Sequence, residues 1–213
     1  MSALVDSDIV ELLNCESPSE RLIVTPLLDR KEQIGPGSVD LRLGTEFLET
    51  ARPNNRAIDP FDAEAQDTMR ATQVKSYIPL GDEFVLHPGQ FALGGTLEFI
   101  GLPKTLTGQV LSRSSWGRLG LLVATAVAVQ PGFQGVLTLE LVNAGSVPIV
   151  LRPGVRIAQL QLWRAAREAN VSYSNNGKYK APLGPESNRL AWEDSEKQTL
   201  RAISDRIHAR VVK

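Results

Sequence analysis

Residues 135–163 read GVLTLELVNAGSVPIVLRPGVRIAQLQLW, three short apolar segments separated by turns that contain glycine or proline. In the first segment Leu137, Leu139 and Leu141 occupy alternate positions, which is the period of a strand with one buried face. Short apolar segments and Gly/Pro turns alternate in the same way from residue 76 onward. Turn signals at this spacing predict an all-β fold, either a barrel or a pair of packed sheets.

The N-terminal part adds a helix and another strand. Residues 5–14 predict a short helix that Asp6 or Ser7 can cap. Residues 35–47, GPGSVDLRLGTEF, enter a strand through a Pro-Gly turn. Alternate apolar residues lie on one face of this strand, namely Val39, Leu41 and Leu43. Residues 49–75 are polar and predict a loop.

The pattern divides the chain into three parts. Residues 1–169 carry the β-barrel. Residues 170–190 are rich in Asn, Gly, Ser and Pro and predict a mobile segment. Residues 191–213 predict a helix, because apolar residues recur there at helical spacing, namely Leu200, Ile203, Ile207 and Val211. We expect this apolar stripe to pack on its own domain or on a neighbouring subunit.

Charge and cysteine usage exclude several classes of protein. Lys and Arg total 23 and Asp and Glu total 24, so we expect no surface for a nucleic acid polymer, although a local basic pocket for phosphates remains possible. The N-terminus has no basic start of a signal peptide, and the nearly apolar run 119–129 is too short to cross a bilayer. Cys15 is the only cysteine, which favours the cytoplasm.

Residues 112–118, SRSSWGR, combine hydroxyl and guanidinium groups beside a glycine. Such a set suits phosphate oxygens, because arginine offers paired, charge-assisted hydrogen bonds. The alternative is a polar surface turn in which Ser115 caps a helical turn.

Glu140 is a carboxylate in the middle of an apolar strand, on the face opposite the leucines. It either faces solvent or lies in a pocket, because an unpaired buried carboxylate is costly. A pocket would suit it to move protons near neutral pH. Residues 173–178 hold an aromatic and a lysine that could close over a ligand; the alternative is a solvated tail.

Together these segments resemble the dCTP deaminase family of the dUTPase-like superfamily. The resemblance rests on SRSSWGRLGL (112–121), TA (125–126), PGFQGVLTLELVN (131–143) and PIVLRPGVRIAQL (148–160). The segment at 37–47 resembles the N-terminal strand of the family, and KY (178–179) with GP (184–185) resembles its C-terminal lid. The order of the segments is more specific than any one of them.

The resemblance implies a distorted jelly-roll-like β-barrel, a homotrimer with active sites between subunits, and a deoxynucleoside triphosphate substrate. It implies a catalytic set of Glu140 as proton shuttle with Ser114, Arg113 and Ala126, whose backbone carbonyl would touch the water. It also implies a substrate-binding set, which comprises Ser115, Arg118, Gln130, Thr138, Leu139, Tyr173 and Lys178. Mg²⁺ would arrive on the triphosphate.

No zinc site is expected. Zinc-dependent deaminases of nucleobases take His and Cys ligands at H-x-E and P-C-x-x-C spacing, whereas this chain has one cysteine, and His87 and His208 are far apart. The resemblance therefore predicts metal-independent hydrolysis of the cytosine amine of dCTP.

Three departures from the family keep other functions open. Gln130 stands where relatives usually have Asp, Pro182 stands where a Gln is expected, and Tyr173 is closer to Lys178 than in several relatives. A dUTP diphosphatase or a bifunctional enzyme is the first alternative, although Gln130 is a poor general base. A trimeric nucleotide-binding module without activity is the second.

Overall fold

The computed structural model describes residues 2–50, 71–124, 128–177, 179, 181–187 and 194–211. The chain forms two compact units. The first comprises residues 1–50 and 74–187 and carries the strands, and the second comprises residues 51–73 and 188–213 and carries the C-terminal helix.

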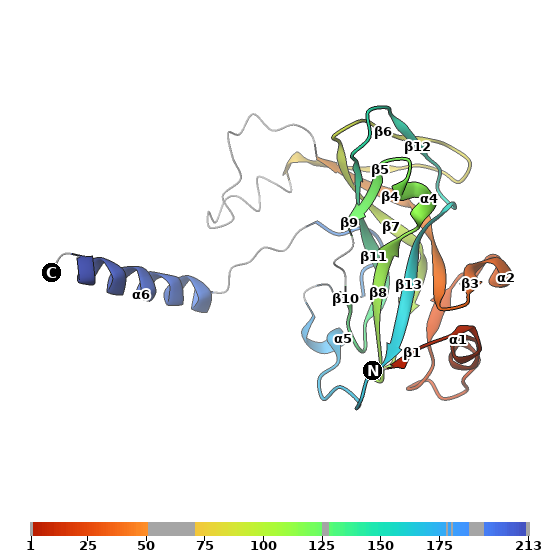
Figure 1. Ribbon diagram of the computed structural model, residues 1–213, viewed down its shortest axis with the longest axis horizontal. Helices are drawn as coiled ribbons and strands as arrows, with labels where there is room; N and C mark the ends of the chain where they lie inside the picture. The colour runs from red at the N-terminus through yellow and green to blue at the C-terminus, as the bar shows by residue number, and fades with distance from the viewer. Residues whose placement is uncertain are drawn as a thin grey trace. The chain divides into compact units, whose positions relative to one another are not determined.

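The first unit is built almost entirely from antiparallel strands (Figure 1). In chain order they are β1 (Ser2–Ala3), β2 (Ile23–Thr25), β3 (Ile34–Gly35), β4 (Ser38–Thr50), β5 (Gln73–Tyr77), β6 (Phe84–Leu86), β7 (Phe91–Gly101), β8 (Leu106–Ser112), β9 (Leu121–Ala124), β10 (Ala128–Val129), β11 (Gln134–Asn143), β12 (Ile149–Leu151) and β13 (Arg156–Arg164). The all-β prediction is confirmed.

The strands follow the order β10-β8-β13-β4-β7-β11-β9 in one curled sheet, and β12 pairs with β6 in a separate ribbon. The long strand β4 joins the two halves of the sheet. Its residues Val39–Arg42 pair with β13, and its residues Leu43–Glu49 pair with β7 across a register shift. Because a register shift bends a strand, β4 turns the sheet around the core.

The core contains the alternate residues that the sequence predicts. Val39, Leu41 and Leu43 of β4 are completely buried, and the leucines of β11 are almost completely buried. They pack with Phe47 of β4 and with residues from the other strands, among them Ile100, Leu106, Leu121, Leu151, Ile157 and Leu160.

The predicted N-terminal helix is present as α1 (Asp6–Leu13), which buries Ile9 and Leu12. The predicted cap was wrong. Val5, not Asp6 or Ser7, is the N-cap residue, and its backbone N–H donates to the carboxylate of Asp8 at 3.1 Å. The cap therefore lies at least one residue earlier than the sequence indicates. The carboxylate of Asp8, inside the first turn, accepts from the backbone N–H of Val5.

The described residues also form the single-turn helices α2 (Arg30–Gln33), α4 (Ser114–Gly117) and α5 (Tyr173–Asn176). The C-terminal helix α6 (Asp194–Val211) lies within the predicted range. Leu200, Ile203 and Ile207 are exposed along it, so the expectation that its apolar stripe packs on its own domain or on a neighbouring subunit stays a prediction. Residues 51–70, inside the predicted loop, lie outside the described residues.

Candidate functional site

The SRSSWGR segment forms α4 and the residues on either side of it. The indole N–H of Trp116 donates to the main-chain oxygen of Arg156 at 2.8 Å, which fastens this turn to β13. Ser114, Ser115 and Arg118 are exposed. Hydroxyls and a guanidinium thus face outward from a turn that is held firmly on the sheet.

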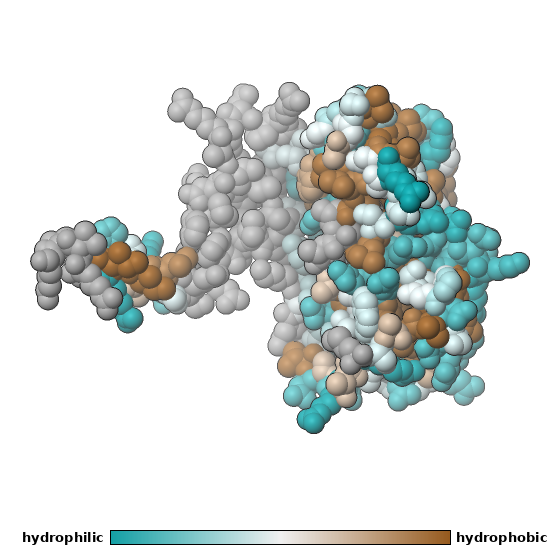
Figure 2. All heavy atoms as spheres, viewed as in Figure 1, coloured by the Kyte–Doolittle hydropathy of each residue, from teal (hydrophilic) through white to brown (hydrophobic). Residues whose placement is uncertain are grey.

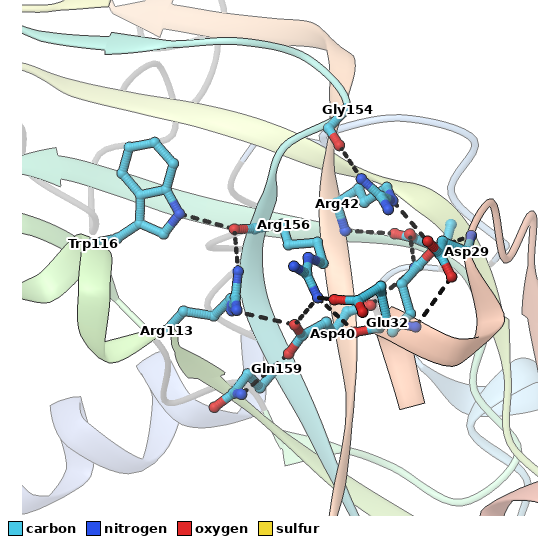
Figure 3. Close-up of polar contacts among 11 residues, drawn as sticks. Asp29, Glu32, Asp40, Arg42, Arg113, Trp116, Gly154, Arg156 and Gln159 are labelled. Carbon is cyan, nitrogen blue, oxygen red and sulfur yellow. Dashed lines mark hydrogen bonds and ion pairs between the residues drawn. The ribbon is translucent and has the colours of Figure 1, made fainter. Parts of the chain in front are cut away.

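Arg113, just before α4, belongs to a network of polar side chains (Figure 3). Its Nε lies 3.3 Å from Oδ2 of Asp40, and its Nη1 donates to the main-chain oxygen of Arg156 at 3.3 Å. Arg156 also approaches Oδ2 of Asp40, at 3.4 Å. Gln159 donates to Oδ1 at 3.1 Å. Asp40 therefore joins β4, β13 and the residue that precedes α4.

Glu140 lies on the outward face of β11, because Leu139 and Leu141 on either side of it point into the core. Its side chain is exposed in the single chain. Its strand neighbours are Leu93 of β7 and Ala124 of β9. The next row on the same face is formed by Phe91, Val142 and Leu122. Glu140 is thus a carboxylate beside an apolar row.

The two other predicted residues of β11 differ in their orientation. Thr138 lies on the same face as Glu140, and its hydroxyl accepts a hydrogen bond from the backbone N–H of Glu186 at 3.2 Å. The side chain of Leu139 is only 2% exposed, so only its backbone could contact a ligand.

Gln130 and Tyr173 line a pocket of about 570 Å³ together with residues of the C-terminal segment. The aromatic ring of Tyr173 packs against Phe133 with ring centroids 5.7 Å apart. Its backbone N–H donates to the oxygen of Pro131 at 3.0 Å. The pocket therefore lies between the turn that follows β10 and α5.

Residues 181–187 run beside β11. The backbone N–H of Val136 donates to the oxygen of Pro182 at 2.7 Å, and both Pro182 and Pro185 are buried. This segment thus reaches the face of β11 that carries Thr138. The predicted mobility of 170–190 stays a prediction. Ala126 and Lys178 lie outside the described residues.

Those predicted residues that the structure describes do not gather in one place within a single chain. Figure 1 shows α4 towards one end of the barrel and α5 towards the other. The Ser114–Ser115 turn and the Gln130–Tyr173 pocket are therefore separate features of the domain.

Sequence reasoning missed Asp40, Arg156, Gln159 and Trp116. The alternation in β4 indicates that Asp40 and Arg42 lie on the face opposite the leucines, but it does not reveal what covers that face. The sequence signal that was available is the pair of charged residues, Asp40 and Arg42, within the otherwise apolar start of β4.

Among the described ranges no group of three His, Cys, Asp or Glu side chains is placed to hold a metal ion. Likewise, no helix in those ranges has the length and apolar character needed to span a bilayer.

Comparison with known families identifies the family of the chain. Residues 5–165 match the family model described as dCTP deaminase-like. The chain belongs to the dCTP deaminase-like family. This family assignment agrees with the resemblance found in the sequence.

Individual relatives cover most of the chain. A protein of Halorubrum lacusprofundi named dCTP deaminase is 42% identical over 191 residues, which are 88% of this chain and 90% of that protein. A protein of Dictyoglomus turgidum named "dCTP deaminase, dUMP-forming" is 40% identical over 190 residues, 88% of this chain and 94% of that protein.

The fold is similar to that of a solved structure. The 2'-deoxycytidine 5'-triphosphate deaminase of Agrobacterium tumefaciens superposes with a TM-score of 0.56 at 24% identity. The match covers 76% of this chain and 48% of that one. At this identity the likeness establishes the fold of the barrel.

Proposed function

We propose that this chain hydrolyses the cytosine amine of dCTP, giving dUTP and ammonia. The observation that carries the proposal is the carboxylate of Glu140 on the outward face of β11. Deamination needs a group that takes a proton from water and returns protons to the base, and one carboxylate can do both. The names of the relatives from Halorubrum and Dictyoglomus support the substrate.

In the proposed reaction Glu140 removes a proton from water, which attacks C4 of cytosine, and delivers that proton to N3. It then takes the proton of the new hydroxyl group on C4 and gives it to the amine. The C4–N bond breaks, ammonia leaves and the C4 carbonyl of uracil forms. Ser114 and the backbone carbonyl of Ala126 orient the water, and Arg113 stabilises the developing charge. The chemistry needs no zinc, because the carboxylate performs the proton transfers.

The remaining predicted residues bind the nucleotide. Ser115, Arg118 and Lys178 hold the triphosphate, whose Mg²⁺ enters as part of the substrate. Gln130 lies near the sugar, Tyr173 belongs to the segment that closes over the nucleotide, and Thr138 with the backbone of Leu139 lines the edge of the pyrimidine. Residues 170–190 act as a lid. Binding energy from the phosphates positions the base for attack.

We propose a homotrimer whose active sites lie between subunits. Two observations support it. The SRSS turn and the Gln130–Tyr173 pocket lie towards opposite ends of one barrel (Figure 1), so a second chain could bring them together. Apolar side chains are also exposed over the end that carries β6, β9 and β12 (Figure 2). Leu122, for example, is 51% exposed in the row next to that of Glu140. Exposed apolar surface of this kind suits an interface.

Two other functions are alternatives to deamination of dCTP alone. A diphosphatase, alone or coupled to deamination, would fit the relatives named dUMP-forming. That reaction needs a carboxylate near the α-phosphate, and the family position holds the amide of Gln130. A nucleotide-binding trimer without activity would keep the barrel and lose only the chemistry.

One assay separates the three functions. The protein is incubated with dCTP, dCMP, dUTP and CTP in Mg²⁺, and ammonia and pyrophosphate are measured separately. Ammonia without pyrophosphate from dCTP supports the proposal. Pyrophosphate from dUTP supports a diphosphatase. Nucleotide binding without either product supports the inactive module.

A further inference from the structure

The side chain of Asp40 is an almost buried carboxylate that forms ion pairs with two arginines. It is 10% exposed, and Oδ2 lies 3.3 Å from Nε of Arg113 and 3.4 Å from Nη1 of Arg156. Its Oδ1 accepts from Gln159. A carboxylate at this depth is stable only because it is paired and hydrogen-bonded.

The two arginines depend on Asp40 to different degrees. Arg156 also donates to the main-chain oxygen of Glu32 at 2.6 Å and approaches the Glu32 carboxylate at 3.5 Å. Within the described residues, the only carboxylate in contact with Arg113 is Asp40. Removing the charge of Asp40 would therefore leave Arg156 with an anionic partner and Arg113 with none.

The contacts of Arg113 fix the direction of its guanidinium. Asp40 binds Nε, and the main-chain oxygen of Arg156 binds Nη1. Contacts to two different nitrogens of a planar group leave it a single orientation. The side chain is 28% exposed, so part of the group stays accessible. The next residues along the chain are Ser114 and Ser115, in the turn that Trp116 fastens to β13.

We propose that Asp40 is a positioning residue for deamination, which acts by holding Arg113 in one orientation beside Ser114. This inference rests on the proposed function, because Arg113 is taken there as the group that stabilises charge on the reacting base and water. Asp40 touches no substrate. Its contribution lies in the direction of the guanidinium, and small errors in such a direction cost large factors in rate.

The test is a double-mutant cycle with Asp40→Asn and Arg113→Lys, measured by ammonia release from dCTP. Asparagine keeps the shape of Asp40 and removes its charge. We expect Asp40→Asn to lower kcat by about tenfold or more and to change KM by less than about threefold, since the triphosphate contacts are not altered. In the Arg113→Lys background we expect the same change to cost less than about twofold, because lysine lacks the Nε–H that Asp40 holds.

Glu83→Gln is the matched control. Glu83 also pairs with an arginine, Arg152, but on the exposed surface, and we expect less than a twofold change in kcat. Equal losses from Asp40→Asn in both backgrounds would overturn the proposal, since Asp40 would then act without Arg113. A loss confined to KM would overturn it as well.

A crystal structure of the Asp40→Asn protein tests the same proposal without an assay. We expect the guanidinium of Arg113 to have turned away from the main-chain oxygen of Arg156, and an unmoved Arg113 would contradict the proposal.

If Asp40→Asn does not fold, Gln159→Leu loosens Asp40 without removing its charge, and kcat should fall with KM unchanged; an unaltered kcat would count against the proposal. A wild-type protein that releases no ammonia would instead refute the proposed function, and the crystal structure would still test the positioning.

Discussion

Glu98 accepts a hydrogen bond from the side-chain amide of Gln33 at 2.8 Å, and both side chains are completely buried. The other oxygen of Glu98 accepts from the backbone N–H of Arg42 at 2.9 Å. The amide of Gln33 also donates to the main-chain oxygen of Asp40 at 3.1 Å. A carboxylate of β7 thus ties the end of α2 to the part of β4 that carries Asp40.

Burial of Glu98 raises its pKa from 4.5 to about 7, although hydrogen bonds from Arg42 and Gln33 and the charge of Arg42 oppose the rise. The folded protein therefore binds this proton more tightly than the unfolded chain. The stability that the proton contributes is fully present below pH ~4.5 and is lost as the pH rises through ~7. The total effect is about 3 kcal/mol at most.

We predict that Glu98→Gln abolishes this part of the pH dependence. Between pH 5 and pH 8.5 the free energy of unfolding of the wild type should fall relative to that of Glu98→Gln, by up to about 3 kcal/mol. Urea unfolding at both pH values measures the difference. Glu83→Gln, which changes an exposed carboxylate, should show the wild-type dependence. Parallel curves for the wild type and Glu98→Gln would contradict the assignment.

The strands could be predicted from the sequence because their signal is local. Alternation in β4 and β11 identified the core leucines, since a half-buried strand shows its two faces directly in the sequence. The same logic placed Glu140 outside the core. The family resemblance supplied the roles, which alternation alone cannot give.

The polar network could not be predicted because it depends on which elements meet. Asp40 reads as an outward-facing charge in β4, yet β13, α2 and the residue before α4 converge on it. Glu98 likewise reads as one polar residue among apolar neighbours of β7. Their partners lie between 7 and 119 positions away in the chain, so no local pattern links them.

We predict a stable homotrimer at micromolar concentration, with a mass three times the chain mass of 23.2 kDa. Leu122 is half-exposed opposite Val142, in the row next to that of Glu140, and a charge there would have to be buried in the interface. Leu122→Glu should therefore yield monomers by light scattering. Leu28→Glu, an exposed leucine before α2, should remain trimeric. A wild-type monomer would contradict the assembly.

We predict that ammonia release survives prolonged treatment with a zinc-selective chelator. Glu140 performs the proton transfers in the proposed reaction, and the chain has too few Cys and His residues for a zinc cage. Withdrawing Mg²⁺ should raise the KM for dCTP, because the ion screens the triphosphate. Activity that is lost to the chelator and restored only by zinc would refute the mechanism.

We predict that residues 172–187 contribute to nucleotide binding more than to folding. A chain that ends at residue 171 should keep its barrel by circular dichroism and bind dCTP at least about tenfold more weakly by calorimetry. A chain that ends at residue 187 keeps Tyr173 and the segment beside β11, and it serves as the control for loss of α6. Unfolding of the shorter chain, without a separate effect on affinity, would instead indicate a structural tail.

The last prediction is that the enzyme releases ammonia and no pyrophosphate. Deamination needs a carboxylate that faces the pyrimidine, which is the proposed place of Glu140. Cleavage between phosphates needs a carboxylate that faces water near the α-phosphate. Gln130 has an amide at that position, which cannot take a proton at neutral pH, so a general-base contribution of ~10²–10⁴-fold is missing.

Glu140→Gln should abolish ammonia release while dCTP still binds, because the amide keeps the shape of the side chain and cannot transfer the proton. Gln130→Asp should keep deamination within about tenfold if residue 130 contacts only the sugar. Stoichiometric pyrophosphate from dUTP with the wild type would favour the diphosphatase, and full activity of Glu140→Gln would remove Glu140 from its role.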